Sequence, residues 1–165
     1  HDVVLISGPV ALAVPVGGEP PRVTPGEELF EAAAAEFARC DVFVMCAAVC
    51  DYKPARFAPQ KMKKERGLFS LALEPTRDIL SSLTSSPHDC FVVGFAAETE
   101  ELRRNARRKL AEKKCDLLVA NDVAQSDIGW DSDYNELLIF FKSGEEKKIS
   151  REKKQKLAKQ LLKIS

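Results

Sequence analysis

The sequence is poor in the residues and motifs that define many common functional sites. Histidine occurs only at His1 and His88. A Ser-His-Asp triad or a histidine-based metal site would have to use one of these two residues, which argues against both kinds of site. Neither the GxGxxG dinucleotide fingerprint nor the GxxxxGK[ST] phosphate loop is present. Basic and acidic residues number 25 each, and the lack of net positive charge argues against a nucleic-acid-binding protein.

Long hydrophobic runs and paired cysteines are absent as well. The apolar stretches are far shorter than a membrane-spanning helix requires, and no signal peptide is recognisable, so the sequence predicts a cytoplasmic protein without membrane association. The five cysteines form no CxxC pair, which is typical of free thiols in a reducing compartment. Cys46 and Cys50 lack a histidine partner and are predicted to be buried structural thiols.

Apolar runs that alternate with helical patterns are the strongest positive signal. Four continuously apolar, strand-like runs cover residues 2–8, 41–47, 90–95 and 115–120. Helices are predicted after an N-cap at Thr24 and over residues 99–114 and 150–165, and the first of them has an inner stripe of Leu29, Ala33 and Phe37. This pattern indicates an α/β fold with a Rossmann-like, mostly parallel sheet and helices on both faces.

Two further segments complete the predicted fold. Residues 136–141 and 146–149 flank a Lys-Ser-Gly-Glu turn and are expected to form a C-terminal hairpin. Residues 69–73 alternate in polarity and are expected to form an edge or arm strand beside a flap. Because the chain opens directly on a strand, we expect one domain, residues 1–165, that lacks the first strand–loop–helix unit of such a fold.

Acidic residues follow three of the predicted strands, each after a run of small residues. They are Asp51, Glu98 and Asp122. Ligands of open α/β sheets bind beyond the carboxyl ends of the strands, so we expect these segments to meet at one ligand site. Any one of these residues taken alone is as well explained by a helix cap or an Asx turn.

A lysine cluster lies downstream of Asp51. Lys61, Lys63 and Lys64 stand between a proline-rich loop and residues 69–73, a placement that suits a flap able to close over a triphosphate. The alternative is a solvated basic loop, which composition alone favours.

Five short segments carry a resemblance to a known family. Their sequences are LISGPV at residues 5–10, AAVCDY at 47–52, KMKK at 61–64, VGFAAET at 93–99 and ANDV at 120–123. In this order and spacing they resemble the signatures of bacterial phosphopantothenoylcysteine synthetase, over almost the whole chain. The resemblance implies a ligase that activates 4′-phosphopantothenate with CTP as an acyl-cytidylate and then joins it to cysteine.

The resemblance also implies roles for individual residues. Lys61 and Asp51 are the candidate catalytic residues: Lys61 would stabilise charge on the α-phosphate, and Asp51 would bind the ribose or organise the reacting centre. The acyl substrate is expected at Ala47, Ala48 and Asp51. The implied CTP contacts are Met45, Cys46, Ala47, Asp51, Lys61, Thr76, Arg77, Asp78, Ile79, Phe95, Lys109 and Lys113. Thr76 and Arg77 stand where the family has Asn-Pro.

Cofactors and partners follow from the same resemblance. Mg²⁺ is expected to arrive on the triphosphate, no protein metal ligand is assigned, and no flavin is expected on this chain. The implied partners are CTP, 4′-phosphopantothenate, cysteine, a second copy of the chain in a homodimer, and a fused or separate phosphopantothenoylcysteine decarboxylase. The alternatives are a nucleotide-binding domain without catalysis and a dimerisation domain of a flavoprotein.

Overall fold

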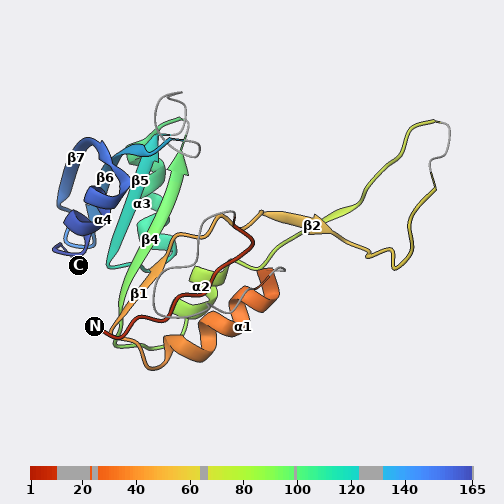
Figure 1. The fold of residues 1–165 in the computed structure, drawn as a ribbon, viewed down its shortest axis with the longest axis horizontal. Coiled ribbons are helices and arrows are strands. Elements are labelled where there is room, and N and C mark those ends of the chain that lie inside the picture. Colours follow the sequence, from red (N-terminus) through yellow and green to blue (C-terminus); the bar gives the residue numbers. More distant parts are fainter. Residues whose placement is uncertain (11–22, 24–25, 64–66, 99, 123–131, 165) are drawn as a thin grey trace.

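A five-stranded sheet forms the body of the molecule (Figure 1). The computed structural model describes residues 1–10, 23, 26–63, 67–98, 100–122 and 132–164. In spatial order the strands are β1 (Val42–Met45), β4 (Phe91–Glu98), β5 (Leu117–Asp122), β6 (Tyr134–Phe141) and β7 (Glu146–Lys153). The first three run parallel, and β6 and β7 add an antiparallel hairpin. The predicted Rossmann-like sheet and C-terminal hairpin are confirmed.

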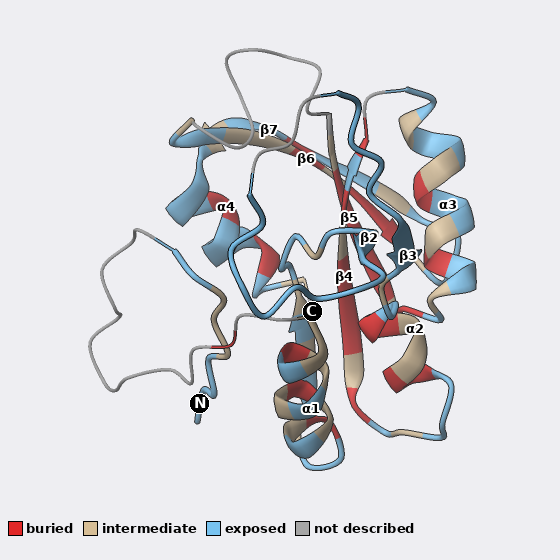
Figure 2. Ribbon diagram, turned by 90° about the vertical axis from the view of Figure 1, so that its right-hand side faces the viewer, coloured by how far each residue is buried: buried red, intermediate tan, exposed pale blue. Residues whose placement is uncertain are grey.

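Helices cover both faces of this sheet. Within the described residues they are α1 (Gly26–Phe37), α2 (Ile79–Thr84), α3 (Leu102–Glu112) and α4 (Lys154–Leu161). Side chains of β4 and β5 alternate between the faces, so Val92 and Leu118 pack with α1, α2 and α3, whereas Val93 and Leu117 pack with α4. Figure 2 shows the burial concentrated on β4 and β5. No helix in the described part of the chain is long and apolar enough to cross a membrane.

Local sequence explains where α1 and α2 form. Glu27 and Glu28 lie in the first turn of α1, where negative charge offsets the positive end of the helix dipole. The inner stripe predicted for this helix (Leu29, Ala33 and Phe37) is buried. Sequence analysis missed α2, which begins where the Asp78 carboxylate accepts a hydrogen bond from Ser81 N at 3.0 Å.

The amino-terminal prediction is wrong. Residues 2–8 are apolar enough for a buried strand, yet Val3 and Val4 are 82% and 60% exposed. The segment makes one backbone bridge, from Val23 N to Ser7 O at 3.0 Å. A β-strand forms only where a neighbouring strand offers an edge for hydrogen bonding. Residues 2–8 do not form a strand because none of the described strands pairs with them. The run at 41–47 does form β1, but as a sheet edge on which Val42 and Val44 are exposed.

A two-stranded arm projects from the body. β2 (Tyr52–Pro54) pairs with β3 (Leu73–Pro75), and the segment between them runs away from the sheet (Figure 1). Every described residue of this arm is exposed, with Phe57 and Phe69 among the largest side chains. The strand predicted over residues 69–73 is therefore wrong except at Leu73, because the ladder ends where its two chains diverge.

Gly94 sets how closely the helices approach the sheet. A Cβ atom at this position in β4 would lie 3.0 Å from Cys115 Sγ, Leu118 Cδ1 and Leu80 Cδ2. Side chains from α2, β5 and the loop before β5 thus fill the space that a larger residue would need. Only glycine lets α2 and β5 meet β4 at this depth.

We expect Gly94→Ala to lower the free energy of unfolding by about 1–3 kcal/mol, because the added methyl overpacks a filled core. Urea unfolding measures the change. Gly8→Ala is the matched control, since its Cβ would meet only Val23 O at 3.8 Å, and should stay within about 0.5 kcal/mol. Equal effects of the two substitutions would contradict this account of the packing.

Candidate functional site

A cavity of about 260 Å³ lies at the carboxyl ends of β1 and β4. These parallel neighbours are in register from Val42 opposite Phe91 to Met45 opposite Gly94, so the loop after β1 starts beside the last residues of β4, which continues to Glu98. This edge is where α/β sheets bind ligands. The predicted site residues that line the cavity are Met45, Ala47, Ala48, Asp51, Thr76, Arg77, Asp78, Ile79, Phe95, Lys109 and Lys113.

Two predicted contacts do not line this cavity. Cys46 is exposed beside it, and Lys61 is exposed on the arm. Cys50 is exposed too, so the expectation of buried thiols at Cys46 and Cys50 is wrong; the loop after β1 lies outside the core. Lys64 and the side chain of Asp122 fall outside the described part of the structure.

Sequence analysis missed four lining residues, all uncharged: Val49, Leu80, Ala96 and Ala97. Leu80 belongs to α2, a helix that the sequence pattern does not predict. Ala96 and Ala97 belong to β4, which continues to Glu98 and so extends three residues past the predicted strand. Sequence analysis does place the run of small residues before Glu98 at the expected ligand site, but it assigns no contact to Ala96 or Ala97.

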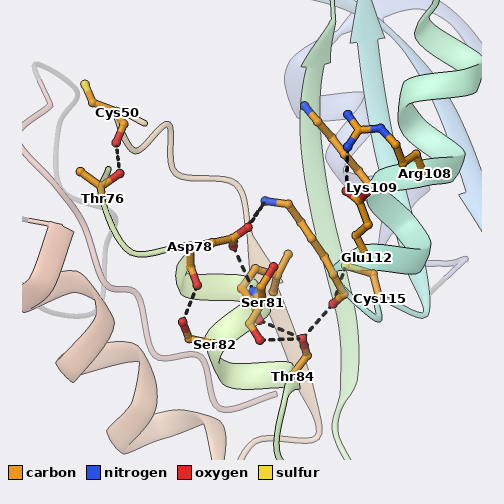
Figure 3. A network of polar contacts seen from close by, with 12 residues as sticks. Cys50, Thr76, Asp78, Ser81, Ser82, Thr84, Arg108, Lys109, Glu112 and Cys115 are labelled. Carbon is orange, nitrogen blue, oxygen red and sulfur yellow. Dashed lines mark hydrogen bonds and ion pairs between the residues drawn. The ribbon is translucent and has the colours of Figure 1, made fainter. Parts of the chain in front are cut away.

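Thr76 joins the two loops that frame the cavity. Its amide donates to Asp51 O at 2.8 Å, and its hydroxyl donates to the carbonyl of Cys50 (Figure 3). The loop after β1 and the loop before α2 are therefore held together by one residue. This junction places Asp51 and Asp78 on the same cavity wall.

Arg77 faces the cavity but is engaged by α1. Its Nη2 lies 2.8 Å from Glu27 Oε1, and its guanidinium carbon lies 4.1 Å from the centroid of the Phe30 ring. The ion pair and the stacking contact fix a planar cation at the rim.

The remaining cations of the cavity are Lys109 in α3 and Lys113, the C-cap residue that follows α3. Lys109 Nζ lies 2.7 Å from Glu98 Oε1, and Lys113 Nζ lies 3.2 Å from Asp78 Oδ2. Each ammonium is thus paired with one carboxylate from the sheet or from the α2 cap. The cavity can accept an anion because these ammonium groups carry further N–H donors.

Asp78 combines a structural contact with a place in the cavity wall. Partial burial by itself would raise its pKa, but hydrogen bonds from Ser81 and the charge of Lys113 outweigh that effect and lower the pKa below its usual value. Figure 3 shows this carboxylate beside Ser81, and Lys113 Nζ lies 3.4 Å from Asp78 Oδ1. A lowered carboxyl pKa contributes stability above the unfolded-state pKa, and that contribution is lost as the pH falls through the folded-state pKa.

We expect Asp78→Ala to lower the free energy of unfolding by about 1 kcal/mol at neutral pH, since the N-cap acceptor of α2 is lost. Asp78→Asn keeps an acceptor and should cost less, and its difference from wild type should disappear in acid, where Asp78 is protonated. Denaturant titrations at several pH values test this. Asp89→Asn, at an exposed position, is the control; a pH-independent gap between Asp78→Asn and wild type would contradict the electrostatic part.

The fold and the cavity define a Rossmann-like α/β domain with a charged ligand site at its strand ends. Comparison with known proteins gives the family. The chain belongs to the family described as the DNA/pantothenate metabolism flavoprotein C-terminal domain, which matches residues 1–164.

Relatives support the same assignment. The coenzyme A biosynthesis bifunctional protein CoaBC of Vibrio vulnificus is 38% identical over 165 residues, covering 98% of this chain and 41% of that protein. CoaBC of Bacillus subtilis is 40% identical over 148 residues, covering 89% and 36%. The chain therefore spans about two fifths of the length of these relatives.

Solved structures agree on the fold. The crystal structure of the C-terminal domain of CoaBC has a TM-score of 0.77 at 30% identity, covering 97% of this chain and 70% of that one. A DNA/pantothenate metabolism flavoprotein from Streptococcus pneumoniae has a TM-score of 0.78 at 20% identity, covering 97% and 78%. The second likeness supports the fold alone.

Proposed function

We propose that this domain is a CTP-dependent phosphopantothenate–cysteine ligase of coenzyme A biosynthesis. The observation that carries the proposal is the convergence of eleven residues implied by the family resemblance on one cavity. These residues come from four separate parts of the chain, so a shared cavity is not a consequence of sequence proximity. Relatives that are coenzyme A biosynthesis proteins support the same function.

The proposed reaction has two displacements. A carboxylate oxygen of 4′-phosphopantothenate attacks the α-phosphorus of CTP, and pyrophosphate leaves to give an acyl-cytidylate. The cysteine amine then attacks the acyl carbon, CMP leaves with the bonding electron pair, and the amine loses a proton. Negative charge accumulates on the phosphates in the first step, which is where fixed cations contribute most.

The cavity residues would divide this work. Backbone groups at Met45–Ala47 would bind the cytosine edge, and Phe95 would pack against the nucleotide. Lys109 and Lys113 would bind phosphate oxygens from the α3 side. Asp51, at the end of the loop held by Thr76, would orient the ribose or the acyl carboxylate. Ala47 and Ala48 leave room for the acyl substrate to approach the backbone.

Mg²⁺ would enter this site with the triphosphate. The described residues contain no group of three metal-ligating side chains. Two aspartates line the cavity, and because Asp78 is paired with Lys113, the Asp51 carboxylate is the candidate oxygen donor. One carboxylate together with phosphate oxygens and water suits the way Mg²⁺ is commonly bound with nucleotides. The ion would neutralise phosphate charge as pyrophosphate departs.

Base recognition by backbone groups predicts nucleotide selectivity. We expect CTP to bind at least about tenfold more tightly than ATP, equivalent to about 1.4 kcal/mol, since the donor and acceptor pattern of one base edge is matched. Calorimetry with CTP, ATP, UTP and NADH in magnesium buffer measures the preference. Tight NADH binding would favour the dinucleotide alternative, and equal affinities for CTP and ATP would rule out base-specific recognition.

The exposed arm favours a homodimer. Phe57, Leu68 and Phe69 present large apolar side chains to solvent on a ribbon that extends away from its own body. A second copy would cover them. Lys61 lies on the same arm and does not line its own chain's cavity, so we propose that it serves the site of the partner copy.

Lys61→Gln should lower acyl-cytidylate formation by about a hundredfold or more while thermal unfolding is unchanged, because a cation facing a developing charge is lost from an exposed segment. Pyrophosphate release by the complete gene product measures this. Lys53→Gln, on the same arm near the body, is the control. Pyrophosphate release within twofold of wild type would show that Lys61 is a solvated loop residue.

Mixing Lys61→Gln chains with Asp51→Asn chains shows whether Lys61 acts in the site of the partner copy or in the site of its own chain. If Lys61 acts on the partner copy, a mixed dimer contains one complete site and activity returns. If it acts on its own chain, the mixture stays inactive.

The remaining partner is a decarboxylase. Relatives are bifunctional proteins of more than twice this chain's length. We propose that the product passes to a phosphopantothenoylcysteine decarboxylase in the cytoplasm, fused to this domain or separate from it, and that this domain itself binds no flavin.

A further inference from the structure

Glu98 is a buried acid at the edge of the cavity. It is the last residue of β4, and among the described residues it is one of only two buried polar side chains, the other being Thr84. Alternation along β4 places Glu98 on the same sheet face as Val92 and Ala96, which pack toward α1, α2 and α3. Its carboxylate therefore points toward α3, beneath the wall formed by Lys109.

The contact with Lys109 is an ion pair without good hydrogen-bond geometry. Glu98 Oε1 lies 2.7 Å from Lys109 Nζ, yet this buried oxygen has no hydrogen-bond partner within the described residues. Burying a carboxylate is costly, and its attraction to one ammonium often fails to repay the lost hydration. Packing of α3 on the sheet is already provided by the buried Ala106 and Leu110. Stability alone does not account for an acid at this position.

Lys113 provides an informative contrast. Its partner, Asp78, is needed in any case to cap α2, and the Asp78 side chain is 47% exposed, against 10% for Glu98. Glu98 has no comparable capping role, and its ion-pair partner among the described residues is Lys109. The remaining role for the Glu98–Lys109 ion pair is to fix where the Lys109 ammonium lies.

We propose that Glu98 is a positioning residue that holds the Lys109 ammonium at the tip of β4, ready for a phosphate group of the nucleotide. The inference rests on the proposed function. A lysine ammonium has three N–H donors, and Glu98 occupies the side toward the sheet. The remaining donors can face the cavity, which Lys109 lines. Ordering one long side chain in advance changes affinity by about three- to tenfold.

If Glu98 acted only through its charge, Glu98→Gln would change CTP affinity in the opposite direction. Glu98→Gln removes a negative charge beside a site for a polyanion, and that change alone would tighten CTP binding. If Glu98 acts by holding Lys109, the same substitution weakens CTP binding and leaves cytidine, which has no phosphate, unaffected. A general loss of structure would weaken both ligands.

The test is calorimetry with CTP and with cytidine on wild type, Glu98→Gln, Lys109→Met and the double variant. We expect Glu98→Gln to weaken CTP about fivefold with unchanged cytidine affinity. We expect the double variant to match Lys109→Met, because Glu98 acts only through that lysine. Glu112→Gln, which removes an exposed pair with Arg108 at 2.8 Å on the same helix, is the matched control and should leave CTP affinity unchanged.

Three results would overturn the inference: tighter or unchanged CTP binding in Glu98→Gln, equal weakening of CTP and cytidine, or additive effects in the double variant. If Glu98→Gln fails to fold, Glu98→Asp keeps the charge but shortens the side chain, and it should also weaken CTP selectively. A wild-type chain that binds no CTP would defeat the proposed function and this inference together. Normal CTP binding with an unaffected Glu98→Gln would defeat the inference alone.

Discussion

The parallel pairing of β1 with β4 is the constraint on which the rest of the site depends. β1 leaves the sheet after Met45, opposite Gly94, while β4 continues beside β5 to Glu98, so the loop after β1 runs along the last residues of β4. At Gly94, side chains of β5 and α2 fill the space where a Cβ atom would lie. Its partner Met45 lines the cavity, so this residue pair connects the packing of the core to the cavity. A shift of one residue would send β4 side chains to the opposite face and displace Phe95 from the cavity wall.

The charged groups around this floor are arranged in pairs rather than as a free cationic patch. Lys109, Lys113 and Arg77 each have a carboxylate within 3.2 Å. Pairing keeps the cavity close to electrical balance and holds three long side chains in place. Under the proposed function, a polyphosphate would meet cations that have already lost much of their conformational freedom, which lowers the entropic cost of binding.

The parts of the fold that could be predicted from the sequence are those whose burial produces a regular pattern of apolar residues. β4, β5 and the hairpin are recognisable because burial on both faces or alternation shows in the residue order, and α1 because of its apolar stripe. Residues 2–8 and 69–73 have equally strand-like composition, but whether such a run becomes a strand depends on a pairing edge that local composition does not reveal. The prediction for Cys46 and Cys50 is wrong because their loop lies beyond the sheet. The motifs identified most of the cavity wall, whereas the contact of Glu98 with Lys109 depends on how α3 packs across the end of β4.

In the arm, a substitution can change the proposed catalytic activity without changing the folding stability of the chain. The described residues of the arm bury no side chain, so substitutions there remove almost nothing from the free energy of folding. A screen for the folding stability of the single chain would consequently overlook Lys61. Under the proposed function, a selection for turnover would detect it, and the body could accumulate stabilising mutations without changing the contribution of the arm to catalysis.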